Sequence, residues 1–478
     1  MHRVPVLTLA LQSAIVLTSC PLPKAEAQRP NILILIGDDI DRDSLSPWGG
    51  QAHTPNLDQL ARDGIRLDRA YVNVAMCAPC RQELYSGRTA WRTRAMPNHS
   101  KSVAGTRSLP HYLQPLGYHV GLLGKKHIGP RDAYPFDNVG ELPMKENPNP
   151  KAVRLATRYM TAARDAGNPF CLVVASHDGH SPYTHGASDR YNTNELDVAD
   201  DAIDTPIYRN SLAKHLAEVT NLDDLLGELR LVLQQEGLAD NTLVLFCSEQ
   251  GNAFPFSKWT CFDGGLATGI VAALPSVIPA GKSNDQIVWL SDIVPTLIEA
   301  VGEHPSESDF DGRSQWANFT GGDQAVHEYA FGAFSNCNII DNRERIFPIR
   351  SIRDRRFTLI WSPLHASGIT SNVTLSQALE WVQNDDATMQ NADVAGSWVA
   401  KTKMTQHPQH IKLTRRLHHR PEWALYDRDA DSNELRNLID EPEFADIASE
   451  LKRELMSWLN HWEDSDPVAT EQGFINAK

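Results

Sequence analysis

The chain is short of positive charge for its size, because 45 Lys and Arg stand against 60 Asp and Glu in 478 residues, a net charge of −15. Generic nucleic-acid binding requires a broad basic surface, so this deficit excludes it. Seven cysteines are too few and too irregularly spaced for a disulfide scaffold or a zinc knuckle. The chain is nevertheless 41% apolar, which predicts a sizeable core in two domains or in one large domain with an appendage.

The first 27 residues have the features of an export signal. A short basic start precedes an apolar stretch over 4–17, which is too short to span a bilayer. Two processing sites are open: a lipoprotein-type box that ends in an acylated Cys20, and the Ala-Glu-Ala sequence at 25–27. We therefore predict a signal peptide over 1–27 and a periplasmic or secreted protein. A lipid at Cys20 is its only expected membrane contact.

Four continuous apolar runs predict strands buried on both faces, as in a parallel sheet. They lie at 31–36, 118–123, 170–175 and 242–246. Helical patterns separate them, notably 54–61, with Thr54 as N-cap, and 210–235. The alternation predicts an α/β fold with a largely parallel sheet flanked by helices. Ligands bind such sheets beyond the carboxyl ends of the strands.

The sequence pattern changes near residue 347. Three short strands and a closing amphipathic helix are indicated at 348–353, 357–361, 423–427 and 447–462. The first two strands alternate like half-exposed antiparallel strands. We therefore predict a main domain over 28–345 and a smaller α+β subdomain over 346–478.

Two polar pairs stand directly after predicted strands. Asp38 and Asp39 follow the first strand, and Glu249 and Gln250 follow the fourth. Adjacent carboxylates at a buried strand end repel each other unless a positive charge neutralises them, and oxygen ligands suit calcium or magnesium. The spacing alone equally allows solvated loop residues.

A cysteine and an arginine, Cys77 and Arg81, lie four positions apart at a predicted helix start. Chemistry alone permits Cys77 to be a thiolate nucleophile whose pKa is lowered by the helix N-terminus and Arg81. It equally permits a structural thiol. The wider sequence is needed to choose between them.

The chain resembles the type I sulfatases of the alkaline phosphatase-like superfamily along nearly all of its length after the export signal. Residues 77–81, Cys-Ala-Pro-Cys-Arg, fit the C-x-P-x-R signature by which those enzymes have their cysteine oxidised to formylglycine. Residues 124–129, Gly-Lys-Lys-His-Ile-Gly, fit a second signature, and 177–180, His-Asp-Gly-His, fit a histidine-containing segment. Three further stretches are similar to the branch of the family that removes N-sulfate from glucosamine: 134–137, 254–255 and 423–427.

The resemblance implies an exported sulfuric ester hydrolase with an alkaline phosphatase-like fold, matured by a formylglycine-generating enzyme. It implies a formylglycine at position 77 and one calcium ion that lowers the pKa of the nucleophile. The implied metal ligands are Asp38, Asp39, Cys77, Glu249 and Gln250. The implied catalytic residues are Cys77, Arg81, Lys125, His127, His180 and Lys258, and the implied substrate-binding residues are His177 and Asp178.

The residues differ in their implied roles. Arg81 and Lys125 stabilise the nucleophile, and His127 relays its proton. Lys258 acts as an electrostatic clamp on the sulfate and His180 as a general acid for the leaving atom.

The chain departs from the family pattern at three places. Cys80 stands where Ser is frequent, and Glu249 and Gln250 are each one methylene longer than the usual Asp and Asn. The stretch 334–338 lacks the acidic residue expected of the N-sulfatase branch.

Three functions remain open from the sequence. The first is a sulfatase acting on sulfated sugars, such as glycosaminoglycan or other polysaccharide fragments. The second is a phosphodiesterase or phosphonate hydrolase of the same superfamily. The third is a sulfated-glycan binding protein whose catalysis has lapsed through its altered metal pair.

Overall fold

The structure of the chain is a computed structural model, and it describes residues 29–335, 346–367, 375–384 and 394–476. The predicted export signal, with Cys20, lies outside the described residues, as does most of the stretch 334–338. No helix within the described ranges is both long enough and apolar enough to cross a membrane.

A mixed, largely parallel sheet of eight strands forms the centre of the main domain, in the order β4-β3-β5-β1-β6-β7-β2-β8. The strands are β1 (Asn31–Ile36), β2 (Ile65–Tyr71), β3 (His119–Gly124), β4 (Asp137–Gly140), β5 (Phe170–Ala175), β6 (Thr242–Cys247), β7 (Ala267–Ala273) and β8 (Lys282–Trp289). Only β7 runs antiparallel to its neighbours, β6 and β2. The predicted parallel α/β sheet is therefore confirmed, and all four predicted apolar runs are strands of it.

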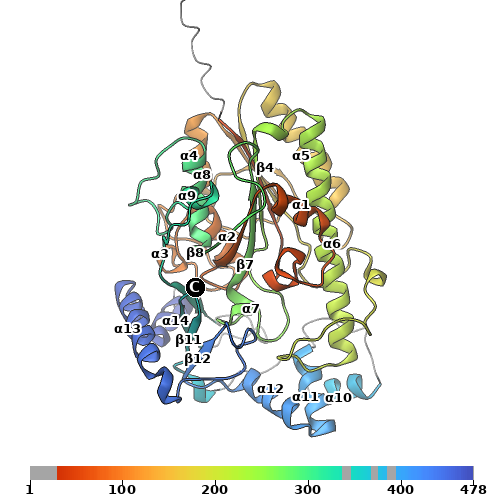
Figure 1. Cartoon of the computed structure of the whole chain (residues 1–478), viewed down its shortest axis with the longest axis vertical. Coiled ribbons are helices and arrows are strands. Elements are labelled where there is room, and N and C mark those ends of the chain that lie inside the picture. The colour runs from red at the N-terminus through yellow and green to blue at the C-terminus, as the bar shows by residue number, and fades with distance from the viewer. Residues whose placement is uncertain (1–28, 336–345, 368–374, 385–393, 477–478) are drawn as a thin grey trace, which may run out of the picture.

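Helices cover both faces of this sheet (Figure 1). One face carries α1 (Pro55–Asp63), α5 (Asn149–Asp165) and α6 (Pro206–Gln235), and the other carries α2 (Cys77–Ser86), α4 (Leu109–Leu113) and α8 (Ile293–Ala300). Three single-turn helices complete the main domain: α3 (Ala90–Thr93), α7 (Asp263–Leu266) and α9 (Trp316–Phe319). Because helices shield both faces, β1, β5 and β6 are buried at every residue.

Thr54 is the N-cap residue of α1, as predicted, but its side chain does not cap the helix. Helix α1 begins at Pro55 as expected. The free N–H groups of Asn56 and Leu57 instead donate to the carboxylate of Asp223, at 3.0 and 2.7 Å. A carboxylate from α6 thus caps α1 across the fold, which no local pattern reveals.

A second, antiparallel sheet has the order β12-β11-β10-β9. Its strands are β9 (Ala330–Phe334), β10 (Ile349–Arg353), β11 (Phe357–Trp361) and β12 (Trp423–Asp427). The helices of this part are α10 (Leu375–Gln383), α11 (Val394–Thr405), α12 (Pro408–His418), α13 (Ala445–His461) and α14 (Pro467–Asn476). Strand β9 belongs to this second sheet although it lies before residue 346. The boundary between the two predicted domains, at residues 345 and 346, stays a prediction.

The expectation that β10 and β11 are half-exposed is wrong. All five residues of β10 and four of the five in β11 are buried. The polar positions of the alternation are buried because they are paired: Arg350 bonds to Asp464 at 2.5 Å, and Arg353 to Asp263 at 3.0 Å. Alternating polar residues therefore mark buried ion pairs here and not a solvent-facing side.

Candidate active site

The carboxyl ends of four adjacent strands bring the predicted residues together. Strands β3, β5, β1 and β6 are neighbours in the sheet, and Lys125, His177, Asp38 and Glu249 each stand one or two residues beyond a strand end. Backbone bonds continue the sheet past those ends, for example from Ser176 N to the last carbonyl of β1 at 3.0 Å. The polar side chains are therefore held in register at one edge of the sheet.

Three carboxylates meet at this edge. Asp38, Asp39 and Glu249 each offer an oxygen within 4.8 Å of the others, and all three side chains are buried. Asp39 and Glu249 have positive φ angles of 57° and 65°, an uncommon conformation that clusters at functional sites. Three buried oxygens here have no hydrogen-bond partner among the described residues: Asp38 Oδ1, Glu249 Oε2 and Gln250 Oε1. Such orphaned oxygens form the donor set of a hard divalent cation, so the residues present fit calcium.

A cation stands against each carboxylate. Lys125 Nζ lies 2.5 Å from Asp38 Oδ2, Lys258 Nζ lies 2.5 Å from Asp39 Oδ2, and Arg81 Nε lies 2.6 Å from Glu249 Oε1. The three charges of each sign therefore balance inside the cluster. An uncompensated charge would be costly at this depth.

The two ends of the carboxylate cluster differ in proton affinity. Burial opposes the ionisation of Asp38, but Lys125, His180 and Arg81 together hold its pKa well below the ordinary value. Burial raises the pKa of Glu249 well above the ordinary value, since Arg81 offsets only part of that effect and the Asp38 charge adds to it.

Cys77 is the first residue of α2 and is buried. Its sulfur lies 3.8 Å from Asn98 Oδ1, toward which the thiol donates. Burial raises the pKa of the Cys77 thiol, and the opposing effect of Lys125 and Lys258 is smaller. The thiolate form of Cys77 is therefore disfavoured at this position, which argues against the first of the two interpretations of the Cys77–Arg81 spacing.

The histidines of the 177–180 segment face different carboxylates. His180 Nε2 lies 3.7 Å from Asp39 Oδ2, while its Nδ1 donates to Ser181 O at 2.7 Å. Nε2 is therefore the nitrogen of His180 that remains able to exchange a proton. His177 Nδ1 lies 4.0 Å from Asp38 Oδ2, and burial lowers the pKa of His177 to about 4, so its ring is neutral at neutral pH.

Asp178 is the predicted site residue that the structure does not bring to the cluster. Its carboxylate is fully buried and bonds to Ser176 Oγ at 2.8 Å, to His185 Nδ1 at 2.8 Å and to Asn221 Nδ2 at 3.1 Å. Glu218 on α6 accepts backbone N–H groups from the same loop, at Gly179, Thr184 and His185. Asp178 and Glu218 therefore hold the loop that carries His177 and His180.

Two functional-site residues were missed by the sequence analysis. Asn98 and His99 follow α3, and they contact Cys77 and His127 respectively. No sequence signal marks them, because they lie in an irregular segment 21 and 28 residues from their partners. Only the folded chain makes them neighbours.

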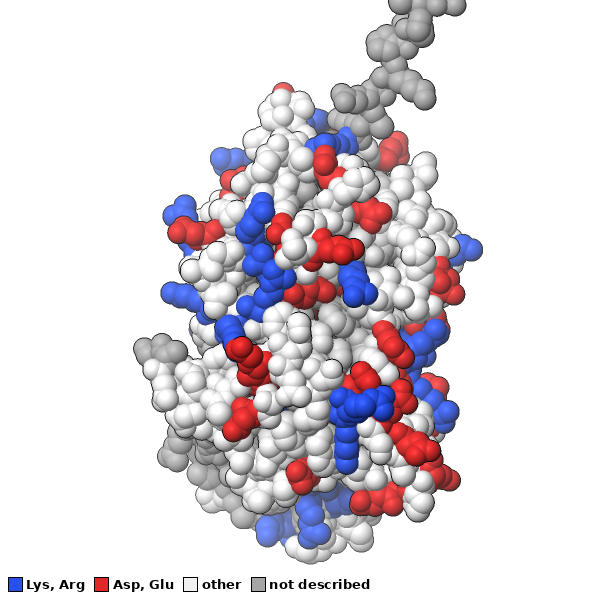
Figure 2. All heavy atoms as spheres, turned by 90° about the vertical axis from the view of Figure 1, so that its left-hand side faces the viewer, with Lys and Arg blue, Asp and Glu red and all other residues white. Residues whose placement is uncertain are grey.

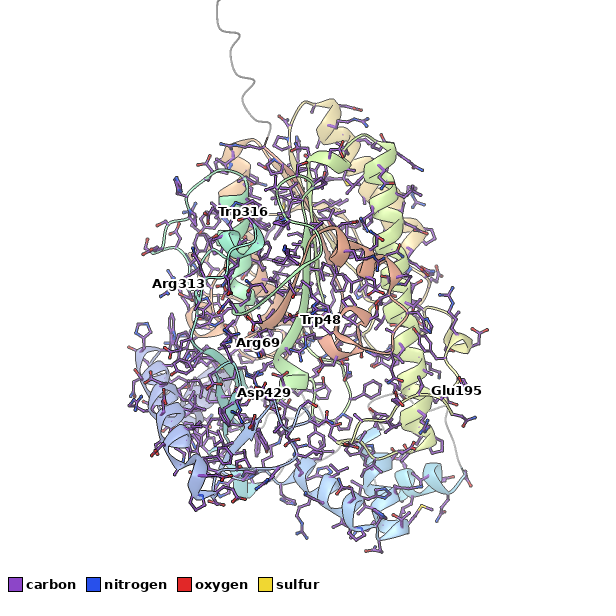
Figure 3. The ribbon with its side chains drawn as sticks, viewed as in Figure 1. Trp48, Arg69, Glu195, Arg313, Trp316 and Asp429 are labelled. Atoms are coloured by element: carbon purple, nitrogen blue, oxygen red, sulfur yellow. The ribbon has the colours of Figure 1, made fainter. Side chains whose placement is uncertain are left out.

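A charged pocket of about 730 Å³ lies apart from these residues. Trp48, Arg69 and Asp429 are among its lining residues (Figure 3). Charged side chains that line this pocket form ion pairs with one another, for example Arg69 with Asp285 at 3.0 Å. Basic and acidic side chains are likewise interspersed on the face drawn in Figure 2.

The fold and this cluster define a class of protein. A family profile described as Sulfatase matches residues 30–303, which is more than half of the chain. The chain belongs to the sulfatase family, an enzyme class that hydrolyses sulfuric esters. The family resemblance and the expected fold are thereby confirmed.

Two named sulfatases match nearly the whole chain in sequence. The chain is 28% identical to an ulvan-active sulfatase of Formosa agariphila, over 91% of this chain and 81% of that protein. It is 27% identical to N-sulphoglucosamine sulphohydrolase of Homo sapiens, over 96% of this chain and 97% of that protein.

Solved structures share the fold at lower identity. A protein in complex with its substrate D-glucosamine-2-N,6-O-disulfate matches with a TM-score of 0.68 and 18% identity, over 92% of this chain and 99% of that one. A phosphonate monoester hydrolase from Silicibacter pomeroyi matches with a TM-score of 0.63 and 17% identity, over 91% and 96%.

Proposed function

We propose that this sulfatase removes sulfate from sulfated sugars, as O-sulfate esters or N-sulfates, through a formylglycine formed at Cys77 and with one calcium ion. The observation that carries the proposal is the meeting of Cys77 with three buried carboxylates and with their partners Arg81, Lys125 and Lys258 at one edge of the sheet. A sulfate group is a compact anion, and such an edge offers it positive charge within a water-poor site.

Asp38, Asp39, Glu249 and Gln250, with the group at position 77, would hold the calcium ion. When present, the formylglycine supplies an oxygen nucleophile and calcium supplies a compact positive charge that favours its deprotonated form. The three buried oxygens without a hydrogen-bond partner support this ligand set, because carboxylate and amide oxygens left unpaired in a buried site suit a hard cation.

The remaining side chains divide the other tasks. Lys258 binds the sulfate oxygens, and Lys125 stabilises the nucleophile. Burial lowers the pKa of each lysine, but the carboxylate partners Asp39 and Asp38 raise it by more, so both groups stay charged. His180 holds a proton for the leaving atom at Nε2, the nitrogen not committed to Ser181. His127 accepts the proton of the nucleophile, and Arg81 orients Glu249.

The substrate class follows from the relatives by analogy. The names of two relatives specify ulvan and N-sulphoglucosamine, both sulfated saccharides. We extend this class to the present chain. We also propose that the protein is exported to the periplasm or outside the cell and matured by a formylglycine-generating enzyme. The site at which the signal is cleaved decides whether Cys20 is acylated. For Asp178, predicted to bind substrate, the contacts with Ser176, His185 and Asn221 favour positioning of its loop.

Hydrolysis of phosphate diesters or phosphonates is the second candidate. The shared fold of the phosphonate monoester hydrolase favours it, at 17% identity. A binding protein without turnover is the third candidate. The Cys-x-Pro-x-Arg signature and the three cations around Cys77 argue against it, because binding alone does not require a residue that can become formylglycine.

The test combines mass spectrometry with substrate turnover. Trypsin should release Ala70–Arg81, which contains both Cys77 and Cys80, and fragmentation should locate a loss of about 18 Da at Cys77 alone, as expected for conversion of the thiol to an aldehyde. The same preparation should release sulfate from glucosamine N-sulfate or ulvan fragments faster than phosphate from matched esters. Unmodified Cys77 with no sulfate released would contradict the proposal.

A further inference from the structure

A hydrogen-bonded pair of imidazoles links the buried site to the surface. His127 Nε2 lies 2.7 Å from His99 Nδ1, and the ring centroids are 4.5 Å apart. The other nitrogen of His127, Nδ1, is buried and has no partner, whereas His99 is exposed. The pair therefore has one end inside the protein and one end in water.

The fold holds both rings in place at a cost. His99 and His127 have positive φ angles of 61° and 49°, a conformation uncommon for residues other than glycine. The loop of His99 is fixed to α2, since Gln82 donates to Ser100 O at 3.1 Å and accepts from Ser102 N at 2.9 Å. The helix that begins at Cys77 thus sets the position of the outer histidine.

Both rings are neutral near pH 7. Burial, with the charge of Lys125, lowers the pKa of His127 to about 3. Burial, Lys125 and Lys258 also lower the pKa of His99. One hydrogen therefore lies between Nε2 and Nδ1, donated by one neutral ring to the other, and neither ring has to keep a positive charge.

We infer that His99 is the outer member of a two-imidazole proton relay, in which a proton taken up at His127 Nδ1 leaves the site through His99. This rests on the proposed function. The O–H bond at position 77 breaks as an N–H bond forms at His127 Nδ1. The hydrogen on His127 Nε2 passes to His99 Nδ1, and His99 Nε2 releases its hydrogen to water. Without His99, the ring of His127 would have to stay positively charged after it takes up the proton, or give the proton back to the group at position 77.

The first test is His99→Ala, with His119→Ala as the matched control. His119 is another exposed histidine, at the opposite end of β3 from the site. Loss of a proton-transfer partner should lower kcat at least about tenfold, with KM within about twofold, because substrate contacts are kept. Imidazole added to the buffer should raise kcat of His99→Ala in proportion to its concentration and leave wild type and His119→Ala unchanged.

The second test separates relay from support. Gln at position 99 offers an amide oxygen that keeps a hydrogen bond to His127 but cannot pass a proton on. The relay requires His99→Gln to stay as slow as His99→Ala. Wild-type turnover in His99→Gln, or a kcat of His99→Ala within twofold of wild type, overturns the relay and leaves the proposed function standing. A wild-type protein that carries formylglycine but releases no sulfate overturns both.

Discussion

Arg81 and Glu249 form an ion pair inside the molecule, with Arg81 Nε 2.6 Å from Glu249 Oε1 and neither side chain more than 1% exposed. The glutamate is one methylene longer than the family's usual aspartate at this position. Its neighbour Gln250 also uses its length, since Nε2 donates to Asp39 Oδ1 at 2.5 Å. The longer pair is therefore built into the contacts of the site.

Shortening the pair should reduce activity. In the double variant Glu249→Asp with Gln250→Asn, both contacts are out of reach, so kcat/KM should fall at least about tenfold, or about 1.4 kcal/mol. Steady-state kinetics and a calcium titration of both proteins measure this. Glu249→Gln is the control that keeps length and removes charge. Wild-type kinetics in the double variant would refute the fit of the longer pair.

Cys77→Ala should abolish turnover and leave the thermal midpoint nearly unchanged. Under the proposed mechanism this position supplies the nucleophile and one metal contact, while an alanine fits the helix start. Cys80→Ala is the matched control, because Cys80 is equally buried three residues on and the C-x-P-x-R signature stays intact. Sulfate release and thermal denaturation of the three proteins check this. Appreciable turnover by Cys77→Ala would exclude the mechanism.

Calcium should stabilise the fold. Removing divalent ions with EDTA should lower the thermal midpoint, and returning calcium at about 100 times its Kd should restore about 2.7 kcal/mol of stability. Asp39→Asn removes a ligand and should remove most of this shift. Identical melting curves with EDTA and with calcium would show that the carboxylate cluster binds no such ion.

Stability should fall between about pH 5 and 7 through Glu218. Burial, with the charge of Asp178, raises the pKa of Glu218 from 4.5 to about 7. A raised pKa means that the folded state prefers the protonated carboxyl, so this contribution is complete below pH 4.5 and is lost as the pH rises through 7. The loss is about 3 kcal/mol.

Urea unfolding at a series of pH values can isolate this contribution. Glu218→Gln cannot ionise, so its free energy of unfolding should change less between pH 5 and 7 than that of wild type. Glu228→Gln, an exposed position on the same helix, should follow the wild-type curve. Parallel curves for wild type and Glu218→Gln would contradict the assignment.

Asp464→Ala should lower the free energy of unfolding by about 3–5 kcal/mol, because it strands a buried guanidinium. Asp464 accepts from Arg350 of the small sheet at 2.5 Å and from Trp91 Nε1 of the main domain at 2.8 Å. Glu463→Gln is the exposed neighbouring control. Equal denaturant midpoints for the two variants would show that this link contributes little.

Local sequence patterns were enough to locate the strands and several residues of the site. Continuous apolar runs such as 170–175 specify strands buried on both faces, and the polar residue directly after a strand must lie at the sheet edge. Asp38, Lys125 and Glu249 were found in this way because strand ends are local features, readable within a few residues.

The partners of these residues could be identified only in the folded chain. Asp223 caps α1 from 167 residues away, Arg350 is buried because Asp464 neutralises it, and Asp178 turns from the site toward His185. The link from His127 to His99 belongs to the same group. Hydrophobic periodicity fixes which face of an element is covered, but the choice among distant polar groups depends on their positions after the chain has folded, because a hydrogen bond forms only at contact distance.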